Sequence, residues 1–287
     1  MEKTWAYQLQ CRDLILVKFL EFRLNNLRET KMRVTVCEMN NSEKDFYRDW
    51  DRFVDHVQKE KSDLVLLPEM PFYPWLFWRN RFDSELWTKS LEAHKRWLER
   101  CKELAPARVL GSNPRETEQV RLNQGFVWDM ENGYRKAHDK FYLPDEEGYW
   151  EASWYSRGDG EFKTVQCGQA LVGFLICSAI WFFERSRRYG KQGAHIVVCP
   201  RATPKNSLDK WLVAGQAAAI VSGAYSLSSN RVVPEGNPAE LGGKGWIIDP
   251  DGRILGMTSA DQPFLTCDID LENAEKAKNT YPRYIPD

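Results

Sequence analysis

The sequence predicts a layered α/β domain in which a mixed sheet is enclosed between helices. Short apolar runs alternate with amphipathic segments along most of the chain. The apolar runs lack polar alternation, which is typical of strands that are buried on both faces. Segments rich in turn residues insert hairpins into this pattern and make the sheet partly antiparallel. Because no internal repeat or low-complexity linker divides the chain, we expect one domain, residues 32–287, after an N-terminal extension.

Residues 1–31 are assigned to this extension because the first convincing core strand, Arg33–Val36, begins after them. Within the extension, Leu14–Phe22 is apolar, but Lys18 and Glu21 interrupt it and no cleavage site of small residues follows. The segment is too short and too charged for a membrane span, so we expect a short amphipathic helix. Whether the extension covers the core or pairs subunits stays open.

The helices are predicted from amphipathic periodicity. Apolar residues recur at spacings of three and four, as expected of helices with one buried face. The helices predicted in this way are Ser42–Glu60, Ser84–Leu104, Phe182–Tyr189 and Leu208–Ser222. Gly190 or Gly193 is expected to close the third helix, and Ser207 is the expected N-cap of the fourth.

The strands are predicted from short apolar runs between these helices. The runs expected to form single strands are Arg33–Val36, Leu64–Leu67, Arg108–Gly111, Leu171–Ile176, His195–Val198, Ala224–Ser228 and Phe264–Ile269. Gly125–Met130 and Tyr134–His138 flank Asn132-Gly133, whose tolerance of positive φ predicts a hairpin turn. A second hairpin is expected over Trp246–Ile254, around Pro250-Asp251-Gly252. A polar tail follows the last strand.

Composition favours a small-molecule partner. A formal net charge of -1 gives no general attraction to nucleic acid or to an anionic membrane. The seven cysteines form no CxxC pair, which argues for reduced thiols in the cytoplasm. The four histidines are widely separated, so neither a metal site nor another cofactor is expected.

Three reactive side chains follow predicted strands. In open α/β sheets, functional groups collect where strands end, and Glu69, Lys140 and Cys177 occupy such positions. Amides at the start of a helix favour a thiolate, so a cysteine at a strand-to-helix turn suits a nucleophile. Taken alone, Cys177 is more typical of a buried core thiol, and the same interpretation applies to Cys199.

The context of the two charged residues strengthens this hypothesis. Glu69 alone fits a capping or ion-paired carboxylate, and Lys140 alone fits a solvated charge. Aromatic and apolar residues, however, follow both: Met70–Trp75 after the first and Phe141–Pro144 after the second. An enclosed charge needs a partner, and converging strand ends would supply one of opposite sign.

The segments around these residues resemble a known family. Three segments are similar, in order and spacing, to the signature segments of the nitrilase superfamily of carbon-nitrogen hydrolases. They are LVLLPEM around Glu69, HDKFYLPDEEGYW around Lys140 and GFLICSAIWFFERSRRYGKQGAHIVVCP around Cys177. The resemblance runs from about residue 33 to the C-terminus. It includes SSNR at 228–231, GGKGWIIDPDG at 242–252 and DIDL at 268–271.

This resemblance implies a four-layer αββα subunit that dimerises through a helix layer, giving a homodimer or a higher homo-oligomer. It also implies a catalytic triad. Glu69 would be the general base, Cys177 the nucleophile, and Lys140 the oxyanion stabiliser together with the amide of Ser178. Many amidases of the family have a second glutamate after the lysine, and Glu147 is the best match here, with Glu146 as the alternative.

The pocket is expected to be aromatic. The residues expected to contact the substrate are Tyr73, Trp150, Ser178, Trp181 and Arg201. Large aromatic side chains also fill cores and interfaces, and this second interpretation accounts for about half of those near the triad. Arg201 is either an ordinary surface arginine or a bidentate ligand for a substrate carboxylate.

Three functions remain open at this point. The first is an amidase or N-carbamoyl amidohydrolase, and the second is a nitrilase that converts a nitrile to an acid. The third is a non-catalytic scaffold, which is suggested by the extension and by Ala179, where family members commonly have an acidic residue. The segment at residues 214–231, AGQAAAIVSGAYSLSSNR, also lacks the Arg-Ala and Glu-Asn pairs that are typical of the amidase and carbamoylase branches of the family.

Overall fold

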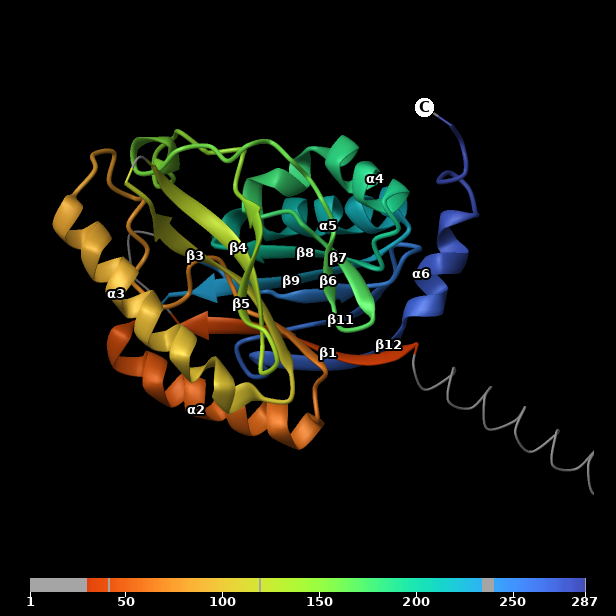
Figure 1. Ribbon diagram of the computed structural model, residues 1–287, viewed down its shortest axis with the longest axis horizontal. Coiled ribbons are helices and arrows are strands. Elements are labelled where there is room, and N and C mark those ends of the chain that lie inside the picture. The colour runs from red at the N-terminus through yellow and green to blue at the C-terminus, as the bar shows by residue number, and fades with distance from the viewer. Residues whose placement is uncertain (1–29, 41, 119, 234–239, 287) are drawn as a thin grey trace, which may run out of the picture. The chain divides into compact units, whose positions relative to one another are not determined.

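The computed structural model describes residues 30–40, 42–118, 120–233 and 240–286. Helices and strands alternate through the compact unit Met32–Asp287, so the α/β class is confirmed (Figure 1). The predicted helix Leu14–Phe22 lies outside the described residues. Among the described residues, no helix combines the length and the apolar character needed to cross a membrane.

The elements have the following bounds. The helices are α2 (Glu43–Glu60), α3 (Ser84–Arg100), α4 (Phe183–Lys191), α5 (Leu208–Ser222) and α6 (Leu271–Lys278). The strands are β1 (Lys31–Asn40), β2 (Leu64–Leu66), β3 (Arg108–Glu116), β4 (Arg121–Asp129), β5 (Gly133–Asp139), β6 (Val165–Cys167), β7 (Ala170–Phe174), β8 (Ile196–Arg201), β9 (Tyr225–Val232), β10 (Trp246–Ile248), β11 (Ile254–Met257) and β12 (Phe264–Asp270). Short 3-10 helices are η1 (Cys101–Leu104), η2 (Glu151–Ser153), η3 (Cys177–Trp181) and η4 (Lys205–Ser207).

Strand β1 joins the two halves of the sheet. Its residues Val34–Val36 pair with β2, whereas Glu38–Asn40 pair with β9, in both cases in parallel. The strand order is therefore β5-β4-β3-β2-β1-β9-β8-β7-β6. The β4–β5 pair is antiparallel, and Gly133 has a φ of 64° at its turn, so the predicted hairpin is confirmed.

Three apolar clusters show the order of the layers. One cluster contains residues of both halves of the sheet, such as Val36 and Leu66 from one half and Val172 and Val198 from the other. A second packs β1 to β4 against α2, α3 and η1, and a third packs β8 and β10 against α4 and α5. Helices therefore cover the outer faces of two facing sheet halves, and Figure 1 shows the two helix pairs on different flanks of the strands.

Some local predictions were wrong. The expected polar tail contains α6, because Asp270 caps the helix by accepting from the Glu272 amide, and Leu271 and Ala274 are buried. Ser207 is the N-cap residue of α5, as expected, but its side chain makes no cap hydrogen bond; the hydroxyl donates to the Pro204 carbonyl instead. Strand β6 was not predicted, because three residues are too few to produce a recognisable pattern.

Candidate active site

The three predicted catalytic side chains lie just beyond strand ends. Glu69 follows β2, and its amide donates to the Arg201 carbonyl over 3.3 Å. Lys140 directly follows β5, and its amide donates to the Asn123 carbonyl over 2.8 Å. Cys177 opens η3, three residues after β7 ends. All three side chains are buried, so a reaction at this site would proceed largely away from bulk water.

The ammonium of Lys140 lies between two carboxylates. Its Nζ is 2.8 Å from Glu69 Oε1 and 2.6 Å from Glu151 Oε2, and all three side chains are fully buried. Burial lowers the pKa of Lys140, but the negative charges of Glu151 and Glu69 outweigh this effect and raise it above its ordinary value. The lysine therefore stays positively charged and can stabilise a negative charge that develops beside it.

Glu151 completes this cluster. The Tyr155 hydroxyl donates to its Oε2, the same atom that Lys140 approaches. Burial raises the pKa of Glu151 to about 7; Lys140 opposes this rise and Glu69 adds to it. The side-chain amide of Asn123 donates to Glu69 Oε1 over 2.8 Å. Glu69 Oε2 and Glu151 Oε1 have no hydrogen-bond partner among the described residues, so one acceptor remains on each carboxyl group.

The thiol of Cys177 lies within the electrostatic reach of this cluster. Burial and the charges of Glu69 and Glu151 raise its pKa well above the ordinary value, whereas Lys140 lowers it. The resting group is therefore a neutral thiol that needs a base to become a nucleophile. Its backbone has a φ of 48°, a left-handed conformation that residues other than glycine rarely adopt.

Four contacts fix the segment after Glu69. Met70, with a φ of 40°, receives a hydrogen bond at its carbonyl from Arg231 Nη1 over 2.9 Å, and Arg231 Nη2 donates to the Tyr73 carbonyl. The Met70 amide donates to the Ser112 hydroxyl. Burial lowers the pKa of His94 to about 3, so its neutral ring accepts from the Phe72 amide. This segment thus holds the candidate base in one position.

The glutamate that the structure places beside Lys140 is not the one expected from the sequence. Glu147 and its alternative Glu146 are exposed on the turn that precedes η2, and the buried carboxyl that contacts Lys140 belongs to Glu151. The sequence contained an indication that Glu151 is buried, because Trp150 and Trp154 lie close to it. Aromatic and apolar neighbours were also the reason for selecting Glu69 and Lys140.

The Arg201 guanidinium donates hydrogen bonds to other residues of the protein. The side chain is fully buried, with Nε donating to the Ser228 hydroxyl, Nη1 to the Thr203 hydroxyl and Nη2 to the Lys244 carbonyl. Its guanidinium also lies 4.1 Å from the centre of the Trp246 ring. Arg201 is therefore not a surface arginine, and it ties β8 to β9. A role in binding a substrate carboxylate stays a prediction.

The other predicted substrate contacts are dispersed. Ser178 donates from its hydroxyl to the Tyr142 carbonyl over 2.6 Å. Trp181 is 41% exposed and packs edge to face against Trp211. Trp150 is half-buried and donates from its amide to the Phe77 carbonyl. Nothing in these contacts tests a role in substrate binding, which stays a prediction.

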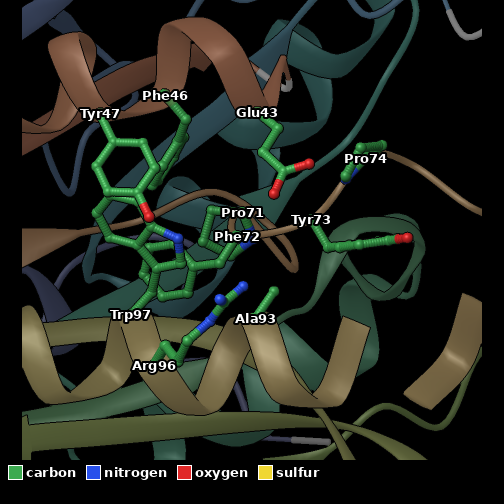
Figure 2. A pocket seen from close by; sticks show the side chains of 10 residues that line it. All are labelled: Glu43, Phe46, Tyr47, Pro71, Phe72, Tyr73, Pro74, Ala93, Arg96 and Trp97. Carbon is green, nitrogen blue, oxygen red and sulfur yellow. The ribbon is translucent and has the colours of Figure 1, made fainter. Parts of the chain in front are cut away.

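Tyr73 lines a separate, small surface pocket between α2 and α3. Figure 2 shows Glu43 and Arg96 beside this pocket, with Phe46, Tyr47 and Trp97 forming an aromatic cluster at one side. The Tyr73 side chain extends away from that cluster. None of Glu69, Lys140 and Cys177 lines the pocket, although residues 71–74, which follow the candidate base, form part of its wall.

The described residues contain no group of three His, Cys, Asp or Glu side chains arranged to hold a metal ion. The chemistry that these side chains support by themselves needs a thiol, a base and a fixed cation. Cys177, Glu69 and Lys140 provide these groups. Such a set can carry out nucleophilic attack on an electrophilic carbon and stabilise the resulting oxyanion.

Comparison with known proteins identifies a family and several relatives. The model of the family described as carbon-nitrogen hydrolase matches residues 33–279. The N-carbamoylputrescine amidase of Oryza sativa subsp. japonica is 30% identical over 251 residues, which cover 80% of this chain and 82% of that protein. The 2-oxoglutaramate amidase of Bacillus subtilis (strain 168) is 28% identical over 238 residues, covering 79% of this chain and 86% of that protein.

Two further comparisons differ in the share of each chain that they cover. The chain spans about half the length of the Solanum tuberosum N-carbamoylputrescine amidase that it matches, with 28% identity over 166 residues, which are 53% of this chain and 54% of that protein. The crystal structure of a carbon-nitrogen hydrolase from Helicobacter pylori G27 superposes with a TM-score of 0.78 at 20% identity, covering 88% of this chain and 94% of that one. At this identity the structural likeness shows a shared fold.

Proposed function

Because the chain belongs to the carbon-nitrogen hydrolase family, we propose that it hydrolyses a non-peptide carbon-nitrogen bond through a thioester on Cys177. The substrate class proposed is a small amide or an N-carbamoyl compound. The observation that supports this most directly is the buried group of Glu69, Lys140 and Glu151, whose charges act on the Cys177 thiol.

The proposed reaction has two stages. Glu69 takes the proton of the Cys177 thiol, and the sulfur attacks the amide carbon to form a tetrahedral intermediate. Lys140 and the amide of Ser178 stabilise the oxyanion. The carbon-nitrogen bond then breaks, and the departing ammonia or amine takes the proton from Glu69. Water, deprotonated by Glu69, attacks the thioester, which releases the acid and restores the thiol.

The unpartnered carboxyl oxygens favour an amide over a nitrile. Glu69 Oε2 and Glu151 Oε1 are buried acceptors without a donor among the described residues. Leaving such atoms unpaired costs free energy, so a substrate that brings N–H donors gains by binding there. A primary amide or a terminal carbamoyl group has two N–H bonds on the reacting nitrogen, whereas a nitrile has none.

The test is ammonia release from matched amides, N-carbamoyl compounds and nitriles of equal chain length. We expect the amide or carbamoyl compound to be hydrolysed at least about 100-fold faster than the matching nitrile, because only the former can satisfy both acceptors. Cys177→Ala serves as the background control. Faster conversion of the nitriles would contradict the amidase assignment and favour a nitrilase.

Glu151 is proposed to orient Lys140 and to accept a hydrogen bond from the substrate nitrogen. Glu151→Gln keeps the shape and the contact with Tyr155, but it turns the unpartnered acceptor Oε1 into an amide donor. We expect kcat to fall by about 10²- to 10³-fold with little change in stability, since Lys140 retains Glu69. Steady-state kinetics and thermal unfolding measure the two effects.

The matched control for this prediction is Glu147→Gln. Glu147 is exposed and was the residue expected from the sequence, so its substitution should change kcat by less than about twofold. A loss of activity in Glu147→Gln together with normal activity in Glu151→Gln would contradict the proposed role of Glu151.

A further inference from the structure

The turn that carries Cys177 has a conformation that needs support. Cys177 has a φ of 48°, in the left-handed region that residues other than glycine seldom adopt. Such a conformation costs free energy and persists only where surrounding contacts hold it. Ala179, two residues later, is buried and has no polar group in its side chain. The turn therefore relies on contacts made by Cys177 itself and by its other neighbours.

Ser178 joins this turn to the segment after Lys140. Its hydroxyl donates to the Tyr142 carbonyl over 2.6 Å, and Tyr142 lies two residues after Lys140. The Tyr142 ring stacks on Phe182, with the ring centres 3.4 Å apart and an angle of 7° between the planes. Arg185 Nε, on α4, donates to the Tyr142 hydroxyl over 2.9 Å. The carbonyl, ring and hydroxyl of one tyrosine thus connect the two segments.

These two segments supply both groups that are proposed to stabilise the oxyanion. Lys140 Nζ is held by Glu69 at 2.8 Å and by Glu151 at 2.6 Å. The amide of Ser178 belongs to the other segment, and the hydroxyl of the same residue reaches across to Tyr142. Donors stabilise an oxyanion most when they are aimed at its position before the reaction begins. A fixed link between the segments keeps the two donors at a constant spacing.

We propose that the Ser178 hydroxyl is a positioning group, which anchors the turn to the Tyr142 carbonyl so that the Ser178 amide and Lys140 Nζ point at the same oxyanion. This inference rests on the proposed function. A hydroxyl has a single proton, and the Tyr142 carbonyl already accepts it, so the Ser178 side chain does not also donate to the substrate. The contribution of the hydroxyl therefore belongs to the chemical step rather than to substrate binding.

The first test measures kcat and KM of Ser178→Ala with the amide that the wild-type protein hydrolyses fastest. This variant keeps the backbone N–H but loses the anchor. We expect kcat to fall by about 10- to 100-fold and KM to change by less than about twofold. Ser178→Thr restores the hydroxyl and should recover kcat to within about threefold of the wild-type value. An unchanged kcat in Ser178→Ala, or an equal loss in both variants, would overturn the inference.

The second test is the rate at which iodoacetamide alkylates Cys177, followed by mass spectrometry. Cys177 keeps a contact of its own in Ser178→Ala, because the Cys199 thiol donates to its carbonyl over 3.7 Å. Alkylation forms no oxyanion, so the variant should react within about threefold of the wild-type rate. A general displacement of the turn would change alkylation and kcat together. Parallel losses in the two rates would therefore contradict a role in aligning the oxyanion donors.

Ser222→Ala is the matched control. The Ser222 hydroxyl is buried on α5 and donates to the Ala218 carbonyl over 2.7 Å, so this variant loses the same kind of bond between residues that the proposed reaction does not use. We expect its melting temperature to fall at least as far as that of Ser178→Ala, while kcat changes by less than about twofold. If kcat fell as far as in Ser178→Ala, lost stability would explain both effects and the inference would be wrong.

Failure of this inference can be distinguished from failure of the proposed function. Hydrolysis of any amide by the wild-type protein supports the proposed function, and the tests above then decide only the role of Ser178. If no amide is hydrolysed, the proposed function fails, and propanal tests Ser178 without turnover.

In the reaction with propanal, the Cys177 sulfur bonds to the aldehyde carbon and the thiol proton passes to the former carbonyl oxygen. The tetrahedral adduct resembles the intermediate of the proposed reaction, so its oxygen depends on the same donors. We expect calorimetry to show about tenfold weaker binding of propanal to Ser178→Ala than to the wild-type protein. Equal affinity, or no adduct on the wild-type protein, would count against the role of Ser178.

Discussion

Replacement of Cys177 by alanine is expected to lower kcat by about 10⁴-fold or more, because the covalent route is lost while the fold remains. The thiol is the only group of the proposed set that forms a bond to the substrate. Glu69 and Lys140 cannot compensate, because a buried base and a fixed cation only assist attack by a nucleophile. Steady-state kinetics, with circular dichroism as a check on folding, measure the effect.

Mass spectrometry after incubation with a slowly hydrolysed amide should detect an acyl adduct on Cys177 in the wild-type protein. Cys199→Ala is the matched control, since Cys199 is buried at a neighbouring position and its thiol donates to the Cys177 carbonyl over 3.7 Å. This variant should still form the adduct. Adduct formation on Cys199 would contradict the assignment, and the absence of both adduct and turnover across amides, carbamoyl compounds and nitriles would favour a non-catalytic scaffold.

Replacement of Lys140 by methionine is expected to remove activity and to lower the free energy of unfolding by about 3–5 kcal/mol. The substitution leaves Glu69 and Glu151 facing each other without a cation in a fully buried site. Burial and the charge of Glu69 already raise the pKa of Glu151, and loss of the opposing charge of Lys140 raises it further, so the folded state of the variant disfavours ionisation of Glu151. The stability deficit should therefore grow as the pH rises from about 5 to 8.

Denaturant unfolding at several pH values measures this deficit. Lys89→Met is the matched control, because Lys89 is 53% exposed and pairs with the exposed Glu85 over 2.6 Å. Its loss should leave the free energy of unfolding nearly unchanged, because exposed ion pairs contribute little to stability. A Lys140→Met protein as stable as the wild type at every pH would show that the two carboxyl groups are not held together by the lysine.

The strand ends were the part of the site that the sequence located well. Glu69, Lys140 and Cys177 were selected because each follows a predicted strand, and the structure brings Glu69 and Lys140 to 2.8 Å from each other. Strand ends can be recognised in a sequence, because a buried strand is a short apolar run and the first polar residue after it marks its end. The α/β class follows from the same alternation.

The partners of buried charges were harder to predict. Glu147 and Glu151 lie four residues apart in one segment, and the path of the chain through η2 buries the second beside Lys140. Arg201 was placed at the surface or in the cleft because it follows Pro200, yet its partners come from β9 and from the carbonyl of Lys244. Such pairings depend on residues far apart in the chain.

The sequence alone determined the α/β class, the main strands and helices, and the three groups that we propose for catalysis. These features follow from local periodicity and from the ends of apolar runs. Pairing of two chains through a helix layer stays a prediction. Only the tertiary structure decided that Glu151 joins Lys140 and that Arg201 is internal. The physical reason is that burial and hydrogen bonding depend on long-range packing, which local pattern does not encode.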